Sequence, residues 1–367
     1  MNIDEIIKKE KLKNTPFSIL LSLKDKFDDN EILDEICNHF EFGSQDLFFE
    51  SLKKFLIRYG ESLSLGNGQA MADQIKRNNK KAEESIIMTW GRPAFIVRDN
   101  KINFPLNFDN VWQQRFKKFE HNVCNAIPNV GRIEIKKHPN SNWIGTGWLI
   151  KGSNIIVTNR HVAQKFASLQ SNLSFGINRN YRGEELEVFI DFKEEHLPKD
   201  LKQFDSINSE IFTFKITRII HINENDEPDL ALLEVSNNNP YGKKLPIGLE
   251  IANYHSNAKD TVFVIGYPAY TDENQVKIYD FIFKDIYNVK RLSPGEIYPS
   301  SAAEYIYEHE CSTWYGNSGS PIIDLHTGKV VGIHYAGANQ ELNRIKSNWA
   351  VRSTYLIELL QELKIFF

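Results

Sequence analysis

The feature that most limits the fold is a long series of short apolar runs, which begins at about Ile86 and continues almost to the C-terminus. These runs are rich in Val, Ile, Phe and Tyr, and clusters of Gly, Asn and Pro separate them. Many short strands spaced by turn residues are typical of antiparallel barrels and sandwiches. The expected strands are 94–99, 130–137, 145–150, 154–159, 186–192, 212–222, 229–235, 261–268, 305–310, 320–324 and 329–336.

Residues 1–85 have a different pattern, in which apolar side chains recur at steps of three and four residues. One clear helix is expected between Ser44, which can cap its N-terminus, and Gly60, which can end it. This region therefore predicts a bundle of about four or five helices. Further helices are expected at 113–127 and 354–367, and the polar stretch 193–205 is interpreted as a surface insertion.

Charge and cysteine content exclude several classes of protein. The formal net charge is -4, which gives no electrostatic reason to expect a nucleic-acid partner. The densest early apolar run, FSILLSL, is too short to cross a bilayer, and no signal segment is recognisable. Three cysteines, Cys37, Cys124 and Cys311, show neither paired nor metal-binding spacing. The sequence thus predicts a cytoplasmic protein without a membrane, metal or cofactor requirement.

One small polar segment, WYGNSGSP at 314–321, raises the question of nucleophilic catalysis, because Ser318 stands between two glycines near an apolar run. A serine hydroxyl needs a base, a group that orients the base, and donors for the oxyanion. An apolar strand is expected to end at Thr158, and His161 follows in a short turn, whereas Asp229 directly precedes the apolar run LALLEV. The chain order His161, Asp229, Ser318 is one of several in which a Ser-His-Asp triad occurs.

Three motifs carry a family resemblance. GTGWLI with IIVTNRHVA, DLALLEV, and WYGNSGSPIID with GKVVGIHYAG together resemble the bacterial branch of the trypsin/chymotrypsin-type serine peptidases. That branch shows a TN-x-HV, a DLALL and a GNSGSP motif. The resemblance covers roughly residues 120–365 and implies an all-β fold of two six-stranded antiparallel barrels, with the active site between them.

The resemblance also implies a role for each motif residue. His161 would be the general base, Asp229 would orient it, and Ser318 would be the nucleophile. The backbone N–H groups of Gly316 and Ser318 would form the oxyanion hole. Protein or peptide chains would be the substrates, and the reaction would need no cofactor.

Departures from the family pattern bear on specificity and control. Ser312 stands where enzymes that cut after Lys or Arg carry an aspartate, so a basic P1 residue (the residue before the scissile bond) is disfavoured. Thr313 and His334 match positions that contact an acidic P1 side chain in glutamyl endopeptidases; the alternative is that His334 only packs beside the pocket. Asn317 replaces the aspartate that pairs with a freed N-terminal amine, so activity should not require one.

The predicted domains are a helical bundle at 1–85, a linker and helix at 86–120, and a trypsin-like serine peptidase domain at 121–367. By architecture, the bundle is similar to modules that recruit such peptidases in bacterial defence or signalling systems. It would then bind a protein partner or oligomerise; the alternative is that it packs on the barrels and stabilises them. Two other functions stay open: a protease-like fold that binds without cleaving, and a peptidase held inactive until a partner docks.

Overall fold

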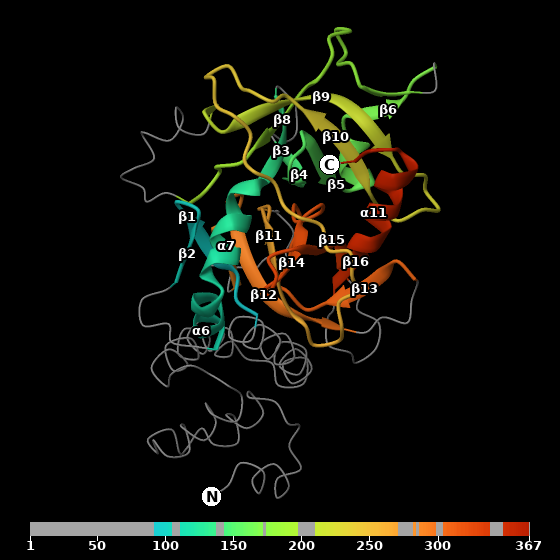
Figure 1. Cartoon of the computed structure of the whole chain (residues 1–367). Coiled ribbons are helices and arrows are strands. Elements are labelled where there is room, and N and C mark those ends of the chain that lie inside the picture. The colour runs from blue at the N-terminus through green and yellow to red at the C-terminus, as the bar shows by residue number, and fades with distance from the viewer. Residues whose placement is uncertain are drawn as a thin grey trace, which may run out of the picture. The chain divides into compact units, whose positions relative to one another are not determined.

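Antiparallel strands dominate the described part of the chain in the computed structural model (Figure 1). Contacts divide the chain into two units; the described part of the smaller includes α6 (Val111–Lys118), and the larger holds every strand described. The predicted helical bundle at 1–85 lies outside the described residues. The structure describes residues 92–104, 111–136, 143–171, 174–196, 210–270, 282–283, 286–298, 304–337 and 348–366.

The first barrel is a closed ring of six antiparallel strands in the order β10-β5-β4-β3-β8-β9. Side chains that point inward form one continuous apolar core, which includes Ile133, Ile156, Val188, Phe214 and Leu233. Its strands are β3 (Val130–Lys136), β4 (Trp143–Leu149), β5 (Ile155–Thr158), β8 (Glu187–Asp191), β9 (Thr213–Ile222) and β10 (Ala231–Val235).

The second barrel has the order β11-β14-β15-β16-β13-β12, and the pairing of β11 with β12 closes the ring. Its buried residues include Val262, Val264, Tyr307, Ile322 and Val331. Its strands are β11 (Thr261–Gly266), β12 (Arg291–Tyr298), β13 (Ile306–His309), β14 (Pro321–Asp324), β15 (Val330–Gly337) and β16 (Asn348–Arg352). The predicted double barrel is therefore confirmed.

A hairpin extends the second barrel. Strand β1 (Phe95–Arg98) pairs with β12, with Phe95 opposite Leu292, and β2 (Lys101–Asn103) pairs with β1. Part of the range predicted as linker and helix therefore belongs to the sheet.

Two strands of the second barrel, β12 and β16, were not expected from the sequence. β12 contains Pro294 and Gly295, which normally interrupt strands, yet Pro294 lies opposite Phe263 of β11.

The predicted helix at 113–127 is divided in the structure, because Phe119 leaves helical geometry between α6 and α7 (Glu120–Ala126). Shorter elements are η3 (Ile127–Asn129), α8 (Arg160–Ala163), β6 (Ala167–Leu169) and β7 (Phe175–Ile177).

The C-terminal helix α11 (Ser353–Glu362) confirms the expected one and packs against β15 and β16. It buries Leu356, Leu359 and Leu360. The hydroxyl of Tyr355 accepts a 2.8 Å hydrogen bond from Asn223, which directly follows β9 of the first barrel. This helix therefore contacts both barrels, so it helps to fix the two barrels relative to each other.

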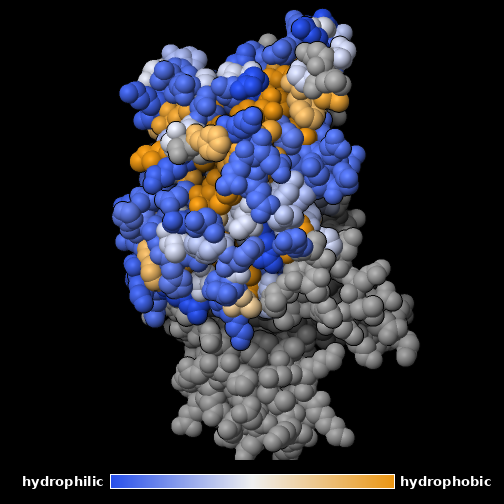
Figure 2. All heavy atoms as spheres, turned by 45° about the vertical axis from the view of Figure 1, so that its right-hand side comes forward, coloured by the Kyte–Doolittle hydropathy of each residue, from blue (hydrophilic) through white to orange (hydrophobic). Residues whose placement is uncertain are grey.

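On the face drawn in Figure 2, most of the coloured surface is hydrophilic, and hydrophobic residues are exposed in patches between the hydrophilic ones. Within the part of the chain that the structure describes, no helix is both long and apolar enough to cross a membrane. Nor do the described residues contain a group of three His, Cys, Asp or Glu side chains that could hold a metal ion.

Candidate active site

His161 and Asp229 form the centre of the site, at the ends of neighbouring strands of the first barrel. The ring atom Nδ1 of His161 lies 2.5 Å from Oδ2 of Asp229, and the other carboxylate oxygen accepts the backbone N–H of His161 at 3.1 Å. The Asp229 side chain is 13% exposed and that of His161 is 40% exposed. The carboxylate of Asp229 therefore fixes both the backbone and the ring of His161. It contacts the ring only at Nδ1, so the second ring nitrogen, Nε2, is not bound by Asp229.

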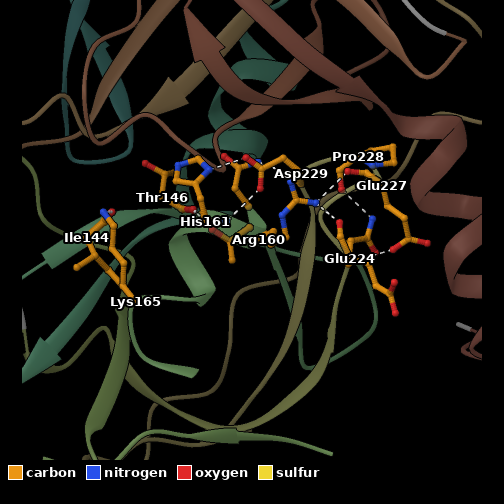
Figure 3. Close-up of polar contacts among 12 residues, drawn as sticks. Ile144, Thr146, Arg160, His161, Lys165, Glu224, Glu227, Pro228 and Asp229 are labelled. Atoms are coloured by element: carbon orange, nitrogen blue, oxygen red, sulfur yellow. Dashed lines mark hydrogen bonds and ion pairs between the residues drawn. The ribbon is translucent and has the colours of Figure 1, made fainter. Parts of the chain in front are cut away.

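The residues before His161 hold the loop that carries the acid (Figure 3). Asn159 donates its side-chain N–H to the carbonyl of Asp229 at 2.8 Å. Arg160 extends along the loop and donates to the carbonyls of Glu224 and Glu227. Since Asn159, Arg160 and His161 are consecutive, the short turn after β5 positions base and acid together.

Ser318 lies in a segment between the two barrels. Its carbonyl accepts the N–H of Thr146 on β4 at 2.9 Å, and the next residue, Gly319, donates its N–H to the carbonyl of His334 on β15 at 2.9 Å. Gly319 has φ +88°, and a Cβ there would overlap the Thr146 carbonyl and crowd the hydroxyl of Thr158, three residues before His161. These contacts place the Ser318 segment beside the end of β5, from which the chain continues to His161.

The backbone before Ser318 makes a turn in which Asn317 donates its N–H to the carbonyl of Trp314 at 3.0 Å. Gly316, the third residue of this turn, has φ +88°, as a type II turn requires. The carbonyl of Tyr315 accepts the N–H of Ala269 at 2.6 Å. In a trans peptide, C=O and N–H point in opposite directions, so the N–H of Gly316 points away from Ala269.

Neither the Gly316 nor the Ser318 backbone N–H donates a hydrogen bond to any residue that the structure describes. The carbonyl of Asn317 is bonded to the N–H of Ser320 at 2.9 Å, which directs the N–H of Ser318 away from that contact. Unbonded N–H groups beside a serine hydroxyl can bind the oxygen of a tetrahedral intermediate.

The hydroxyl of Ser318 is not hydrogen-bonded to His161 or to any other side chain in the described part of the chain. Hydrogen bonds of this kind are often long before substrate binds. The structure therefore shows the contacts between His161 and Asp229, but no hydrogen bond between His161 and Ser318.

The model of the trypsin-like peptidase domain family matches residues 145–333, which is just over half of the chain. The chain belongs to the trypsin-like peptidases. It is a hydrolase of the serine endopeptidase class, and its substrates are proteins or peptides.

Solved structures that resemble this peptidase include an inactive mutant form of Rv3671c from M. tuberculosis H37Rv, with 18% identity, a TM-score of 0.40, and coverage of 66% of this chain and 90% of that one. The serine endoprotease from Yersinia pestis has 15% identity and a TM-score of 0.43, with 67% and 66% covered. The HtrA-type protease AlgW with a decapeptide has 13% identity and a TM-score of 0.43, with 67% of each chain covered. No curated protein sequence matches the chain.

The predicted pocket residues Thr313 and His334 are buried, as is Ser312, whose identity disfavours a basic P1 residue. Ser312, Thr313 and His334 are each less than a tenth exposed. Nδ1 of His334 lies 3.1 Å from Nε2 of His309, which the sequence analysis did not single out. Burial, and then the neighbouring charge of His161, lower the pKa of His334 to about 3. His334 is therefore uncharged at neutral pH.

Asn317 is buried, and its side-chain N–H donates to the Trp314 carbonyl at 3.1 Å. That contact lies within the turn itself, and it uses the side-chain amide as a donor. An aspartate carboxylate has no N–H to donate in this place.

The sequence patterns also did not mark Tyr335, an aromatic residue of the peptidase whose pKa responds to the charge of Asp229. The pairing of β15 with β16 shifts between His334 and Ala336, so Tyr335 is an extra residue in the strand. Burial, and then the charge of Asp229, raise the pKa of Tyr335 to about 12. Its ring lies 6.3 Å from that of Trp349. A regular alternation of side chains does not predict such a bulge, so no sequence signal marked Tyr335.

Proposed function

We propose that this serine endopeptidase cleaves peptide bonds with His161 as general base, Asp229 as the group that orients it, and Ser318 as nucleophile. The contact of His161 with Asp229 carries the proposal, because both carboxylate oxygens are used to hold one histidine. A carboxylate on Nδ1 keeps the proton there, which leaves Nε2 free to accept the proton of an alcohol.

The reaction then follows from these positions. Ser318 Oγ attacks the peptide carbonyl while its proton passes to Nε2 of His161, and Asp229 stabilises the resulting imidazolium. The N–H groups of Gly316 and Ser318 bind the oxyanion. When the C–N bond breaks, the amine takes the proton from His161. Water, deprotonated by His161, then hydrolyses the acyl-enzyme and regenerates the serine.

A fluorophosphonate probe should label the native full-length chain at Ser318, because only an activated serine reacts rapidly with it. The label is located by mass spectrometry of a proteolytic digest, and heat-denatured protein serves as the control. Native protein that stays unlabelled, alone and with candidate partners, would favour the non-cleaving binding module instead. Faster labelling of a chain that lacks residues 1–85 would indicate that this region restrains the site.

We further propose an acidic P1 preference, as in glutamyl endopeptidases, with Thr313 and His334 contacting the substrate carboxylate. The support is the buried pair of His334 and His309, in which one ring nitrogen of His334 is bonded to His309 and the other can donate an N–H to a carboxylate. Because His334 is neutral, recognition would rest on hydrogen bonds rather than on a permanent positive charge.

Replacing His334 with alanine should lower kcat/KM for peptides with glutamate at P1 by about tenfold to a hundredfold, the effect of one hydrogen bond to a charged group. Fluorophosphonate labelling should change much less, since the probe carries no P1 carboxylate. His326→Ala removes an exposed histidine and serves as the matched control. A peptide library that shows a preference for large apolar P1 residues would exclude the acidic pocket and leave the triad untouched.

For residues 1–85 we propose a helical module that recruits the peptidase to a protein partner, in a bacterial defence or signalling system. The support is the change of sequence pattern at about Ile86, from helical periodicity to short strands. Binding of a partner by the full-length chain, and loss of that binding on deletion of this region, would distinguish recruitment from simple packing on the barrels.

A further inference from the structure

The orientation of the Tyr315–Gly316 peptide decides whether Gly316 presents an N–H or Tyr315 presents a carbonyl at the proposed oxyanion hole. Type I and type II turns differ mainly by a rotation of this central peptide. Asn317 carries no charge that could anchor the turn through an ion pair. Other groups must therefore keep the peptide in the orientation that directs the Gly316 N–H away from Ala269.

Trp143, at the start of β4, covers the turn directly. A Cβ on Gly316 would overlap two ring carbons of the Trp143 indole and the carbonyl of Tyr267. The hydroxyl of Thr146 donates to the Gly316 carbonyl at 2.8 Å. Gly316 is therefore enclosed by an aromatic ring, a backbone carbonyl and a hydroxyl, which together limit rotation of its backbone.

A second set of contacts holds the carbonyl end of the same peptide. Ala269 donates its N–H to the Tyr315 carbonyl at 2.6 Å. Asn288 brackets Ala269, because its own N–H donates to the carbonyl of Pro268 at 2.7 Å and its side-chain oxygen accepts the N–H of Tyr270 at 3.0 Å. Asn288 is thus hydrogen-bonded to both chain neighbours of Ala269 and helps to hold Ala269 in place.

Arg132 of β3 connects the two sets. Its guanidinium carbon lies 5.6 Å from the centre of the Trp143 ring, and its Nη1 donates to the carbonyl of Asn288 at 2.8 Å. Nη2 and Nε of the same side chain bind Oε1 of Glu134 at 2.5 and 2.9 Å, and Glu194 lies 3.4 Å from Nη2. Two carboxylates therefore fix the guanidinium, whose side chain is only 13% exposed.

We propose that Arg132 and Trp143 are positioning residues that keep the Tyr315–Gly316 peptide in the orientation needed to bind the oxyanion. This inference rests on the proposed role of the Gly316 N–H. Trp143 restrains Gly316 through its ring, and Arg132 supports both that ring and the Asn288 contact that places Ala269. The turn is thereby held without a charged residue at position 317.

Trp143→Ala and Arg132→Met should slow phosphonylation of Ser318 by a fluorophosphonate probe. The expected loss is about tenfold to a hundredfold, less than that for complete removal of an oxyanion donor and similar to the effect of misplacing a catalytic group by about 1 Å. The maximal labelling rate should fall, whereas the probe concentration that gives half of that rate should change less than about twofold. Trp143→Phe and Arg132→Lys should recover part of the rate, because each keeps a ring or a cation in place.

Arg218→Met is the matched control, since Arg218 is also paired with a carboxylate, that of Glu234 at 2.6 Å, but is 63% exposed. Its labelling rate should equal that of the wild type.

If Trp143 and Arg132 had only a structural role, their replacement would lower the melting temperature and the fraction of protein that reacts, but not the labelling rate of the folded fraction. That result would overturn the inference. The inference would also be overturned if folded variants of Trp143 and Arg132 were labelled at the wild-type rate. If Trp143→Ala and Arg132→Met do not fold, the labelling rates of Trp143→Phe and Arg132→Lys test the inference instead. A wild-type chain that is never labelled would instead contradict the proposed function.

Discussion

Replacing Ser318 with alanine is expected to reduce kcat for peptide cleavage by about 10⁴- to 10⁶-fold, because no other group can form the acyl-enzyme. The residual rate would come from the oxyanion donors and from substrate binding alone. Cleavage is measured on labelled casein and on the peptide that a library identifies as the best substrate. KM for that peptide should change little, since the hydroxyl contributes to bond formation rather than to ground-state binding.

The variant should fold as the wild type does. The Ser318 side chain is partly exposed and makes no hydrogen bond within the described residues, so its loss should change the free energy of unfolding by less than about 0.5 kcal/mol. Ser168→Ala, which removes an exposed hydroxyl bonded to Asn178, is the control. Cleavage by Ser318→Ala at the wild-type rate would show that a different residue is the nucleophile.

Asp229→Asn is expected to lower kcat by about 10⁴-fold while leaving the structure of the site intact. The geometry explains why. One side-chain atom of residue 229 must accept the backbone N–H of His161, so an asparagine would place its oxygen there and its NH₂ group against Nδ1. Nδ1 would then accept a hydrogen bond, the ring proton would move to Nε2, and Nε2 could no longer take the proton of Ser318.

Asp260→Asn provides the comparison for this change, since Asp260 also accepts a backbone N–H, from Asn257 at 2.6 Å, but in a turn outside the site. It should keep wild-type activity within about twofold, because surface substitutions outside such features have small effects. The labelling rate of Asp229→Asn should fall with kcat. If both variants are equally active, Asp229 does not orient the base and the proposed triad is wrong.

The strand pattern and the three motifs could be read from the sequence because each depends on residues that are close along the chain. The run NIIVTN predicts β5 and places His161 just after it, and LALLEV does the same for Asp229 and β10. β12 could not be found in this way, because the neighbouring strands of the barrel stabilise a segment whose Pro294 and Gly295 locally oppose a strand. The predicted bundle at 1–85 lies outside the described residues and stays a prediction.

The side-chain contacts around the proposed active site could not be predicted, because they join residues that are far apart in the sequence. The hydrogen bond from Arg132 to Asn288 spans 156 positions, and no motif marks either residue. The approach of His309 to His334 depends on how β13 and β15 lie across the second barrel. Side-chain partners of this kind follow from the closed fold, whereas strand periodicity shows only which face of a strand is buried.

The hairpin of β1 and β2 has a practical consequence for any shortened version of the enzyme. Arg291 of β12 is buried, and its Nη1 donates to the carbonyl of Ala94, immediately before β1. A fragment designed from the motifs alone, with its first residue at 121, would delete that acceptor and uncover the flank of β12, and a buried cation that loses an acceptor costs about 1–3 kcal/mol. Catalytic fragments for assay or crystallisation should therefore begin ahead of Ala94.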